Sequence, residues 1–129
     1  MKEFMLLVRN EADSKGSLSA EQHQQFLNDC MVYIEGLKKN GNLISAQPLV
    51  REGKMISGSG SAFKDGPYNE TREIIVGYYH IRAEDMDEAV KIARLNPEFA
   101  FTKGAKVEVR PIKTMEESTS YVYPENEKR

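Results

Sequence analysis

Residues 74–97 read IIVGYYHIRAEDMDEAVKIARLNP, and within them a strand pattern is followed directly by a helix pattern, which is the basis for predicting the fold. Ile74–Ile81 carries β-branched and aromatic residues at both alternating sets of positions, which is typical of a strand covered on both faces. Asp85 opens a capping-box pattern for a helix, and Asn96-Pro97 ends that helix. The stretch therefore predicts a buried strand followed directly by a helix.

A strand pattern followed by a helix pattern also occurs near the start of the chain. Phe4–Val8 is a compact apolar run of strand length. Ser19 begins a second capping-box pattern, and the helix that it opens ends at Asn40-Gly41 after two lysines. Apolar residues recur in that helix at intervals of three or four, at Phe26, Cys30, Tyr33 and Leu37, with Leu27 and Ile34 beside them.

Further strand patterns complete the order of elements. Leu43–Val50 and Lys106–Ile112 follow the two helices, and a short strand is expected at Lys54–Ile56. The order β-α-β-(β)-β-α-β predicts an α+β protein with the ferredoxin-like split βαβ arrangement, an antiparallel sheet with both helices on one face. Asp65–Pro67 is a turn signal, and Gly58–Ser61 is expected to be a mobile connection.

A sheet with both helices on one face has a second face to cover. By strand alternation, Tyr78 and His80 are expected on one side of their strand, and Ile75 and Tyr79 on the other. A second copy of the chain is the simplest cover for an apolar sheet face. The sequence therefore predicts a homodimer, with Tyr78 and Val109 on the shared face.

Composition limits the classes of protein to consider. With 129 residues, 40% hydrophobic and 29% charged, the chain fits one globular domain, expected at residues 1–113 with a polar tail at 114–129. A net charge of −2 argues against a nucleic-acid partner. No apolar run approaches the roughly 20 residues that cross a bilayer, so no membrane partner is expected. The single cysteine suits a reducing compartment, and a cytoplasmic location is predicted.

Several motifs carry a resemblance to one family. Residues 64–73, KDGPYNETRE, resemble the DGPF signature of the YCII-related family, and the motifs GYY at 77–79, DEA at 87–89 and VEVRP at 107–111 follow it in order. The resemblance runs from about residue 3 to residue 112. It implies a dimeric α/β barrel, in which two ferredoxin-like units pack sheet to sheet.

The same resemblance implies a proposed catalytic site built on a histidine and an aspartate. Cys30 stands where many relatives carry the histidine, and Tyr68 replaces the phenylalanine of the signature. Both departures bear on whether this chain retains that chemistry.

Asp65 and His23 are the candidate catalytic residues. Asp65 is interpreted as a general base or ligand anchor at a strand end, or alternatively as a turn residue whose side chain binds the backbone. His23 is interpreted as a group at the mouth of a pocket near the start of the first helix, or as an exposed first-turn residue. Cys30 lies seven residues further on, about 10 Å along a helix, too far for a metal shared with His23.

Four further residues are candidates for lining a ligand pocket: Cys30, Tyr33, Tyr78 and His80. Cys30 is either a nucleophile or a small buried hydrophobe. The tyrosines and His80 are either pocket residues or core side chains with a bonded polar tip. Two histidines and one cysteine at unrelated spacings predict no metal, and no glycine-rich fingerprint opens a helix, so no cofactor is expected.

The function expected from the sequence is the binding of a small polar or aromatic metabolite. The pocket is expected between the sheet and the first helix, with Asp65 and His23 at its mouth. If the protein is an enzyme, acid–base chemistry is the natural class, because a carboxylate and a histidine are available. The alternative is a non-catalytic dimerisation or accessory module with a filled barrel, and the sequence leaves the choice open.

Overall fold

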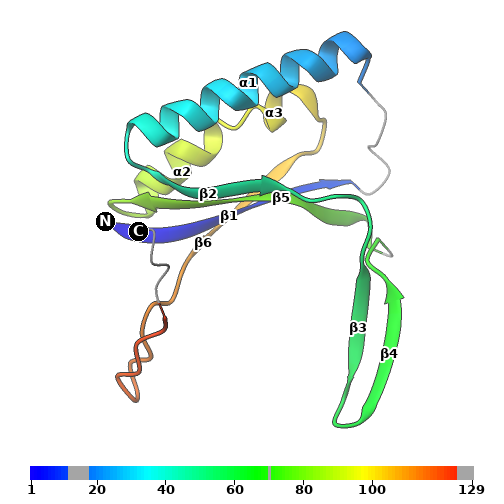
Figure 1. The fold of residues 1–129 in the computed structure, drawn as a ribbon, viewed down its shortest axis with the longest axis vertical. Helices are drawn as coiled ribbons and strands as arrows, with labels where there is room; N and C mark the ends of the chain where they lie inside the picture. The colour runs from blue at the N-terminus through cyan, green and yellow to red at the C-terminus, as the bar shows by residue number, and fades with distance from the viewer. Residues whose placement is uncertain (12–17, 70, 125–129) are drawn as a thin grey trace.

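The fold is an α+β sandwich of one helical layer and one antiparallel sheet, seen in a computed structural model that describes residues 1–11, 18–69 and 71–124 (Figure 1). The sheet has the strand order β2-β5-β1-β6, with every neighbouring pair antiparallel. This order confirms the predicted ferredoxin-like arrangement. The four strands are β1 (Lys2–Glu11), β2 (Leu43–Pro48), β5 (Glu73–Ala83) and β6 (Lys106–Pro111).

The helices begin where the capping patterns predict. In α1 (Ala20–Lys39), the Ser19 hydroxyl accepts from the Gln22 amide and the Gln22 side chain accepts from the Ser19 amide. In α2 (Met86–Arg94), the Asp85 carboxylate accepts from the Glu88 amide at 2.9 Å. Side-chain caps satisfy amides that have no partner within a helix. A third helix, α3 (Glu98–Phe101), has a single turn, too short to leave a periodic signal.

The core lies between the sheet and the helices. Phe4, Leu6 and Ile81 are fully buried on the helix-facing side of the two central strands. Val109 pairs with Leu6 across β1 and β6 and therefore faces the helices as well. The prediction that Val109 lies on a face shared between two copies was wrong, because Val107 and Val109 of β6 pack against the core.

A β-bulge corrects a second expectation about the faces. Val8 pairs with Gly77 and Arg9 pairs with Ile75, so Val76 is an extra residue in β5. The extra residue reverses the alternation, and Ile75 shares the face of Tyr78 instead of the face of Tyr79. Alternation read from sequence assumes an unbroken pleat, and the bulge breaks it.

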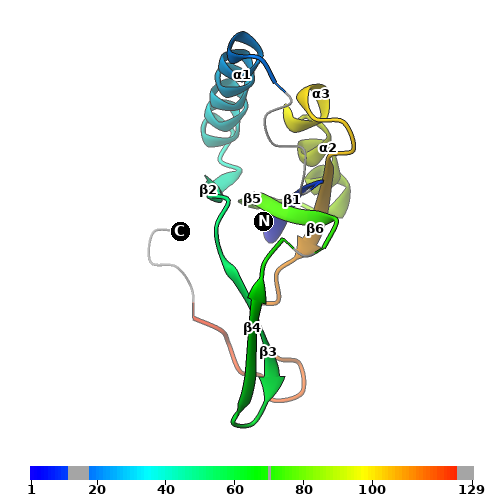
Figure 2. The same cartoon turned by 90° about the vertical axis from the view of Figure 1, so that its right-hand side faces the viewer.

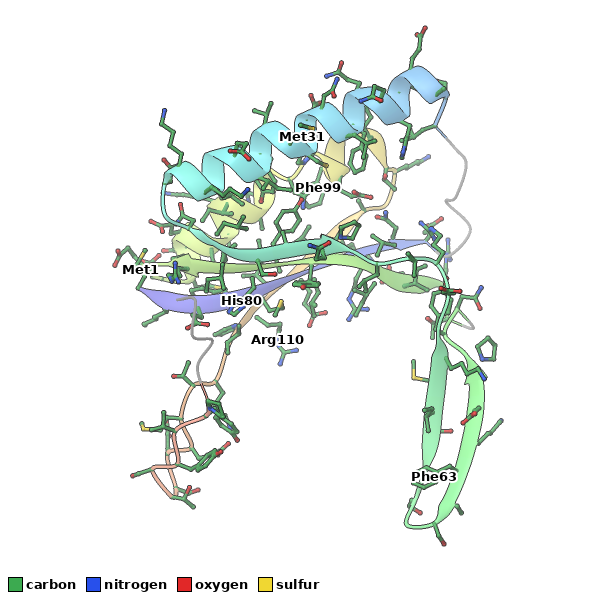
Figure 3. The ribbon with its side chains drawn as sticks, in the orientation of Figure 1. Met1, Met31, Phe63, His80, Phe99 and Arg110 are labelled. Carbon is green, nitrogen blue, oxygen red and sulfur yellow. The ribbon has the colours of Figure 1, made fainter. Side chains whose placement is uncertain are left out.

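The sheet face remote from the helices, here called the open face, contains Glu3, Met5, Leu7, Arg9, Tyr78 and His80 among others. A hairpin arm of β3 (Lys54–Ser59) and β4 (Ala62–Pro67) projects on this side (Figures 1 and 2). Large apolar side chains are exposed along the arm, and the exposed fractions of Ile56 and Phe63 are 64% and 68%. Figure 3 shows Phe63 near the tip of the arm and His80 on the open face.

The arm corrects two predictions about turns. Asp65–Pro67 belongs to β4, and the chain reverses at Gly60-Ser61 instead. Gly60 has a φ of +60° and Gly58 a φ of +143°, and a Cβ at Gly58 would lie 2.0 Å from the carbonyl oxygen of Ala62. Glycine alone adopts such a backbone without strain. The segment interpreted as a mobile connection is therefore a tight hairpin.

The chain beyond β6 also projects on the side of the open face (Figure 1). Within the segment predicted as a tail, the Tyr123 amide donates to the Thr114 carbonyl at 2.9 Å, and the Tyr121 and Tyr123 rings pack edge to face. Residues 125–129 lie outside the described residues. In the part of the chain that is described, no helix combines the length and apolar character needed to span a bilayer.

Candidate functional site

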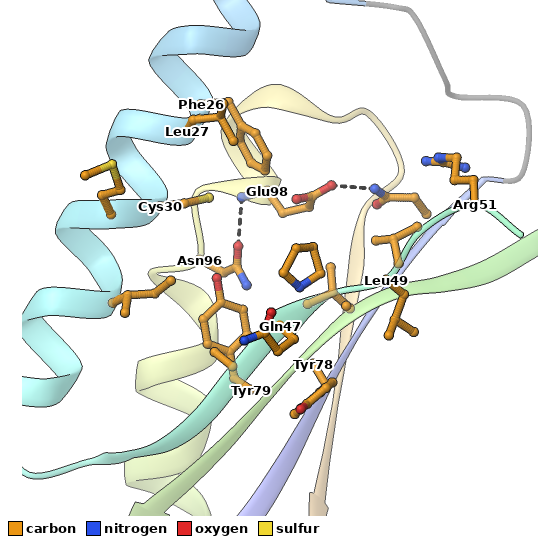
Figure 4. A pocket seen from close by; sticks show the side chains of 18 residues that line it. Phe26, Leu27, Cys30, Gln47, Leu49, Arg51, Tyr78, Tyr79, Asn96 and Glu98 are labelled. Atoms are coloured by element: carbon orange, nitrogen blue, oxygen red, sulfur yellow. Dashed lines mark hydrogen bonds between the residues drawn. The ribbon is translucent and has the colours of Figure 1, made fainter.

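A cavity of about 540 Å³ lies between α1 and the sheet, above the edge formed by β2 and β5 (Figure 4). The ring of Phe101 in α3 packs against Phe26 of α1 with centroids 5.5 Å apart, which holds α3 beside the cavity. The bulge residue Val76 is part of the lining. Apolar side chains make up most of the wall: Val8, Phe26, Leu27, Met31, Ile34, Ala46, Pro48, Leu49 and Val76.

Polar groups gather around Glu98, the first residue of α3. Asn10, at the end of β1, donates from Nδ2 to Glu98 Oε1, although the two residues are 88 positions apart in sequence. Thr102 Oγ1 donates to the same oxygen at 3.2 Å. The backbone amide of Glu98 donates to Asn96 Oδ1 at 2.9 Å. Glu98 therefore links two asparagines, both only 4% exposed (Figure 4).

Each asparagine keeps one buried atom without a partner among the described residues. Asn10 Oδ1 lacks a donor and Asn96 Nδ2 lacks an acceptor. The hydrogen bonds to Glu98 fix both amide orientations, because its carboxylate requires Nδ2 of Asn10 and its N–H requires Oδ1 of Asn96. A buried polar atom without a hydrogen bond costs about 1–3 kcal/mol. Both residues line the cavity, although the two unpaired atoms are themselves buried.

Local sequence explains how these groups arise. Asn10 continues the inward alternation of Phe4, Leu6 and Val8, so an amide occupies a core position at the end of β1. Asn96 precedes Pro97, and its side chain bonds the amide two residues later in an Asx turn. That turn starts α3 and directs Glu98 toward the sheet.

Burial controls the protonation of two groups at the cavity. Desolvation, together with the charges of Glu98 and Asp29, raises the pKa of the Cys30 thiol to about 11. Desolvation also raises the pKa of Tyr79, with Cys30 and Glu98 adding to the effect. At neutral pH, Cys30 is therefore a protonated thiol, which makes it a poor nucleophile.

The structure brings two of the predicted pocket residues to the cavity. Cys30 and Tyr78 both contribute to its lining, although Tyr78 belongs to the open face of β5, where its hydroxyl lies 3.4 Å from Ser45 Oγ. Tyr33 stands behind Tyr79, with ring centroids 5.3 Å apart, and donates its hydroxyl proton to the carbonyl of Ile92.

His80 lies on the other side of the sheet from the cavity. Its Nε2 atom is 2.7 Å from Glu3 Oε1, and both side chains are largely covered. The pair is a feature of the open face and takes no part in lining the cavity.

Asp65 and His23 are not brought together. Asp65 lies in β4, on the arm that projects beyond the open face, whereas His23 is exposed near the start of α1 on the helix-covered side (Figure 1). Neither residue lines the cavity. The His23 ring lies 6.5 Å from that of Phe26.

Sequence reasoning missed Asn10, Asn96 and Glu98. The Asn96-Pro97 pair signalled only the end of a helix, and nothing local marks Asn10 as a partner of a residue so distant in the chain. Of the described residues that line the cavity, Arg51 and Glu98 carry a charge, and Arg51 stands on the side remote from α1 (Figure 4). Among described residues, no group of three His, Cys, Asp or Glu side chains could hold a metal ion.

Comparison with known proteins agrees with the motifs in the sequence. No curated protein matches the chain. The family model described as the YCII-related domain matches residues 3–116, which include α1, α2, α3, the arm and all of the sheet except Lys2. The chain therefore belongs to the YCII-related domain family.

Proposed function

We propose that this protein binds a small, largely apolar or aromatic metabolite in the cavity between α1 and the sheet. One observation carries the proposal: the mostly apolar wall of the cavity includes a carboxylate, Glu98, that Asn10 and Thr102 hold in place by hydrogen bonds. Small-molecule sites typically combine an apolar wall with a few converging polar groups, and their volumes range from about 300 to 1,000 Å³. The cavity described here, at about 540 Å³, falls within that range.

Proton transfer is the chemistry that this arrangement supports best. Glu98 is the one carboxylate among the described lining residues, and it is held in place by Asn10 and Thr102. A held carboxylate beside a bound molecule can accept or return a proton. In this proposal Glu98, instead of Asp65, is the acid–base group of any reaction.

A ligand screen with two variants at one position tests the binding site. Cys30→Phe fills the cavity, whereas Cys30→Ala leaves it open and serves as the matched control. A metabolite at a hundred times its Kd stabilises the folded state by about 2.7 kcal/mol, which raises the Tm by roughly 10 °C for a chain of this size. We expect hits that wild type and Cys30→Ala share and Cys30→Phe loses. Hits that Cys30→Phe retains would place binding elsewhere.

We further propose that a second copy of the chain covers the open face. Met5 and Leu7 lie there beside Tyr78 and His80, and α1, α2 and α3 all lie on the other side of the sheet (Figure 1). Two sheets pack face to face at about 10 Å, and pairing of two identical copies is the commonest assembly. We also propose a cytoplasmic location, because the single cysteine is a free thiol, which suits a reducing compartment.

The arm favours a second candidate function, a non-catalytic dimerisation or accessory module. Ile56, Phe63 and Asp65 share one face of the hairpin, because Ile56 pairs with Asp65 and Phe63 lies two residues before it. A free two-stranded hairpin is at best marginally stable in water. Exposed apolar residues on such an arm favour contact with another chain. If Phe63→Ser abolishes assembly of the protein and leaves ligand binding unchanged, the two functions are separate.

A further inference from the structure

We infer that the ligand of the cavity is an amphipathic carboxylic acid, whose apolar body contacts the cavity wall and whose carboxylate binds Arg51. The inference rests on the proposed function and names the class of molecule that the cavity takes. Arg51 is the one basic side chain among the described residues that line the cavity. It lies in the connection between the sheet and the arm, after β2 ends at Pro48 and before β3 begins at Lys54.

The guanidinium of Arg51 is available to a ligand. Three other arginines, Arg9, Arg72 and Arg110, form ion pairs with glutamates. The Arg51 side chain has no ion pair or hydrogen bond within the part of the chain that the structure describes, and it is only partly covered. A guanidinium stays charged and carries five N–H donors. A carboxylate can accept two of them in parallel, which is among the strongest pairings in proteins.

The chain just before Arg51 is fastened to the edge of the sheet. The Leu49 amide donates to the carbonyl of the bulge residue Val76 at 2.9 Å, and both of these residues line the cavity. Figure 4 shows Arg51 at the side of the cavity remote from α1. A ligand whose carboxylate meets Arg51 can therefore extend its apolar body along the wall toward α1, where Phe26 and Leu27 contribute to the lining.

The charges around the cavity favour a carboxylate over other ionised head groups. Arg51 supplies one positive charge, which balances a single carboxylate, whereas a phosphate monoester carries a charge of about −1.5 to −2 at pH 7. The excess negative charge of a phosphate would share the cavity with Glu98. An amine would have the same charge as Arg51 and could pair only with Glu98, one of whose oxygens already accepts from Asn10 and Thr102.

Four probes that share a phenylpropyl body test this specificity on the wild-type protein. They are 4-phenylbutyrate, 4-phenylbutanol, 4-phenylbutylamine and 3-phenylpropyl phosphate, and their Kd values at pH 7 can be measured by ligand-observed NMR titration. We expect 4-phenylbutyrate to have a Kd about tenfold below those of the amine and the phosphate. A phosphate that binds as tightly as the carboxylate, or an amine that binds more tightly than either, would overturn the carboxylate class.

A single change at Arg51 should remove the preference for the acid. Arg51→Gln deletes the positive charge and keeps a polar side chain. We expect it to weaken 4-phenylbutyrate about tenfold and to change the Kd of 4-phenylbutanol by less than about twofold. The control is Arg94→Gln, which deletes the same charge in the last turn of α2, outside the cavity, and should leave both Kd values unchanged. Equal effects of Arg51→Gln on the acid and the alcohol would overturn the inference.

The outcomes also separate the inference from the function beneath it. If the acid and the alcohol bind wild type and fail to bind Cys30→Phe, but Arg51→Gln affects them equally, the cavity is a binding site and the role of Arg51 is wrong. If neither the probes nor the metabolite screen gives binding that Cys30→Phe abolishes, the proposed function itself is wrong. The ranking of the probes on wild type needs no variant, so it decides the class of ligand even if Arg51→Gln does not fold.

Discussion

Cys30 illustrates how position decides the chemistry of a single residue. It occupies the apolar stripe of α1 and lines the cavity, where burial and the neighbouring charges of Glu98 and Asp29 favour the neutral thiol. A cysteine becomes a nucleophile when cations or a helix N-terminus stabilise its thiolate. The surroundings of Cys30 have the opposite effect, so Cys30 acts as part of the cavity wall.

The reactivity of Cys30 tests this conclusion. With a pKa of about 11, the thiolate fraction at pH 8 is about 0.001, compared with about 0.2 for a free cysteine. Labelling of the native protein by iodoacetamide should therefore be roughly a hundredfold slower than labelling of the urea-unfolded chain. The native rate should rise about tenfold for each pH unit between 8 and 10. A native rate equal to the unfolded rate at pH 8 would contradict the raised pKa.

The same shifts predict how stability depends on alkaline pH. The folded pKa values of Cys30, Tyr33 and Tyr79 are all raised, chiefly by burial. Each group therefore contributes stability that is fully present below its unfolded pKa and lost as the pH rises toward its folded pKa. Urea unfolding should show a falling free energy of unfolding from about pH 9 upward. Cys30→Ala should lose less stability than wild type between pH 9 and 10, and equal losses would exclude a contribution from the thiol.

At the scale of elements, the arm and the bulge in β5 depend on particular backbone positions. Gly58 allows the two strands of the arm to approach closely, and Val76 bends β5 where the cavity wall begins. The two strands of the arm pair with each other and form a sheet that is separate from the four-stranded sheet. Its integrity and the stability of the core should therefore respond to different substitutions.

Two Gly→Ala changes test that separation. Gly58→Ala places a Cβ 2.0 Å from the Ala62 carbonyl oxygen and should disorder the arm, so that chymotrypsin cleaves after Phe63 faster. Thermal unfolding of the core should change little. Gly36→Ala, in α1 with open space around the new Cβ, is the control and should stabilise the fold by about 0.5–1 kcal/mol. Loss of the whole fold in Gly58→Ala would show that the arm and core unfold together.

At the scale of the whole molecule, the two faces of the sheet have different roles. The helix-facing side is filled by Phe4, Leu6 and Ile81. The open face combines apolar side chains with ion pairs, including Arg9 with Glu108 at 3.0 Å. The apolar side chains on this face are what a second copy of the chain would bury in the proposed pairing.

A charge introduced on each face should have distinct effects. Leu7 lies on the open face. The variant Leu7→Glu should be a folded monomer, because the introduced charge opposes the pairing of two copies. Val109→Glu faces the buried Leu6 and should destabilise the fold by about 3 kcal/mol or more. Sedimentation velocity and circular dichroism distinguish these results. A Leu7→Glu protein that remains dimeric, or a wild-type protein that is monomeric, would contradict pairing through the open face.

The capped helices, the order of elements and hence the fold could be predicted from sequence, because caps and periodicity depend on residues a few positions apart. The groups that meet at the cavity could not be predicted, because they come together only through tertiary packing. Asn10 and Glu98 are 88 residues apart, and α3 is one turn long, so no local pattern could pair them. The bulge at Val76 and the hairpin at Gly60 likewise reassigned Ile75 and Asp65. Local propensity sets each element, whereas the packing of distant elements sets the chemistry between them.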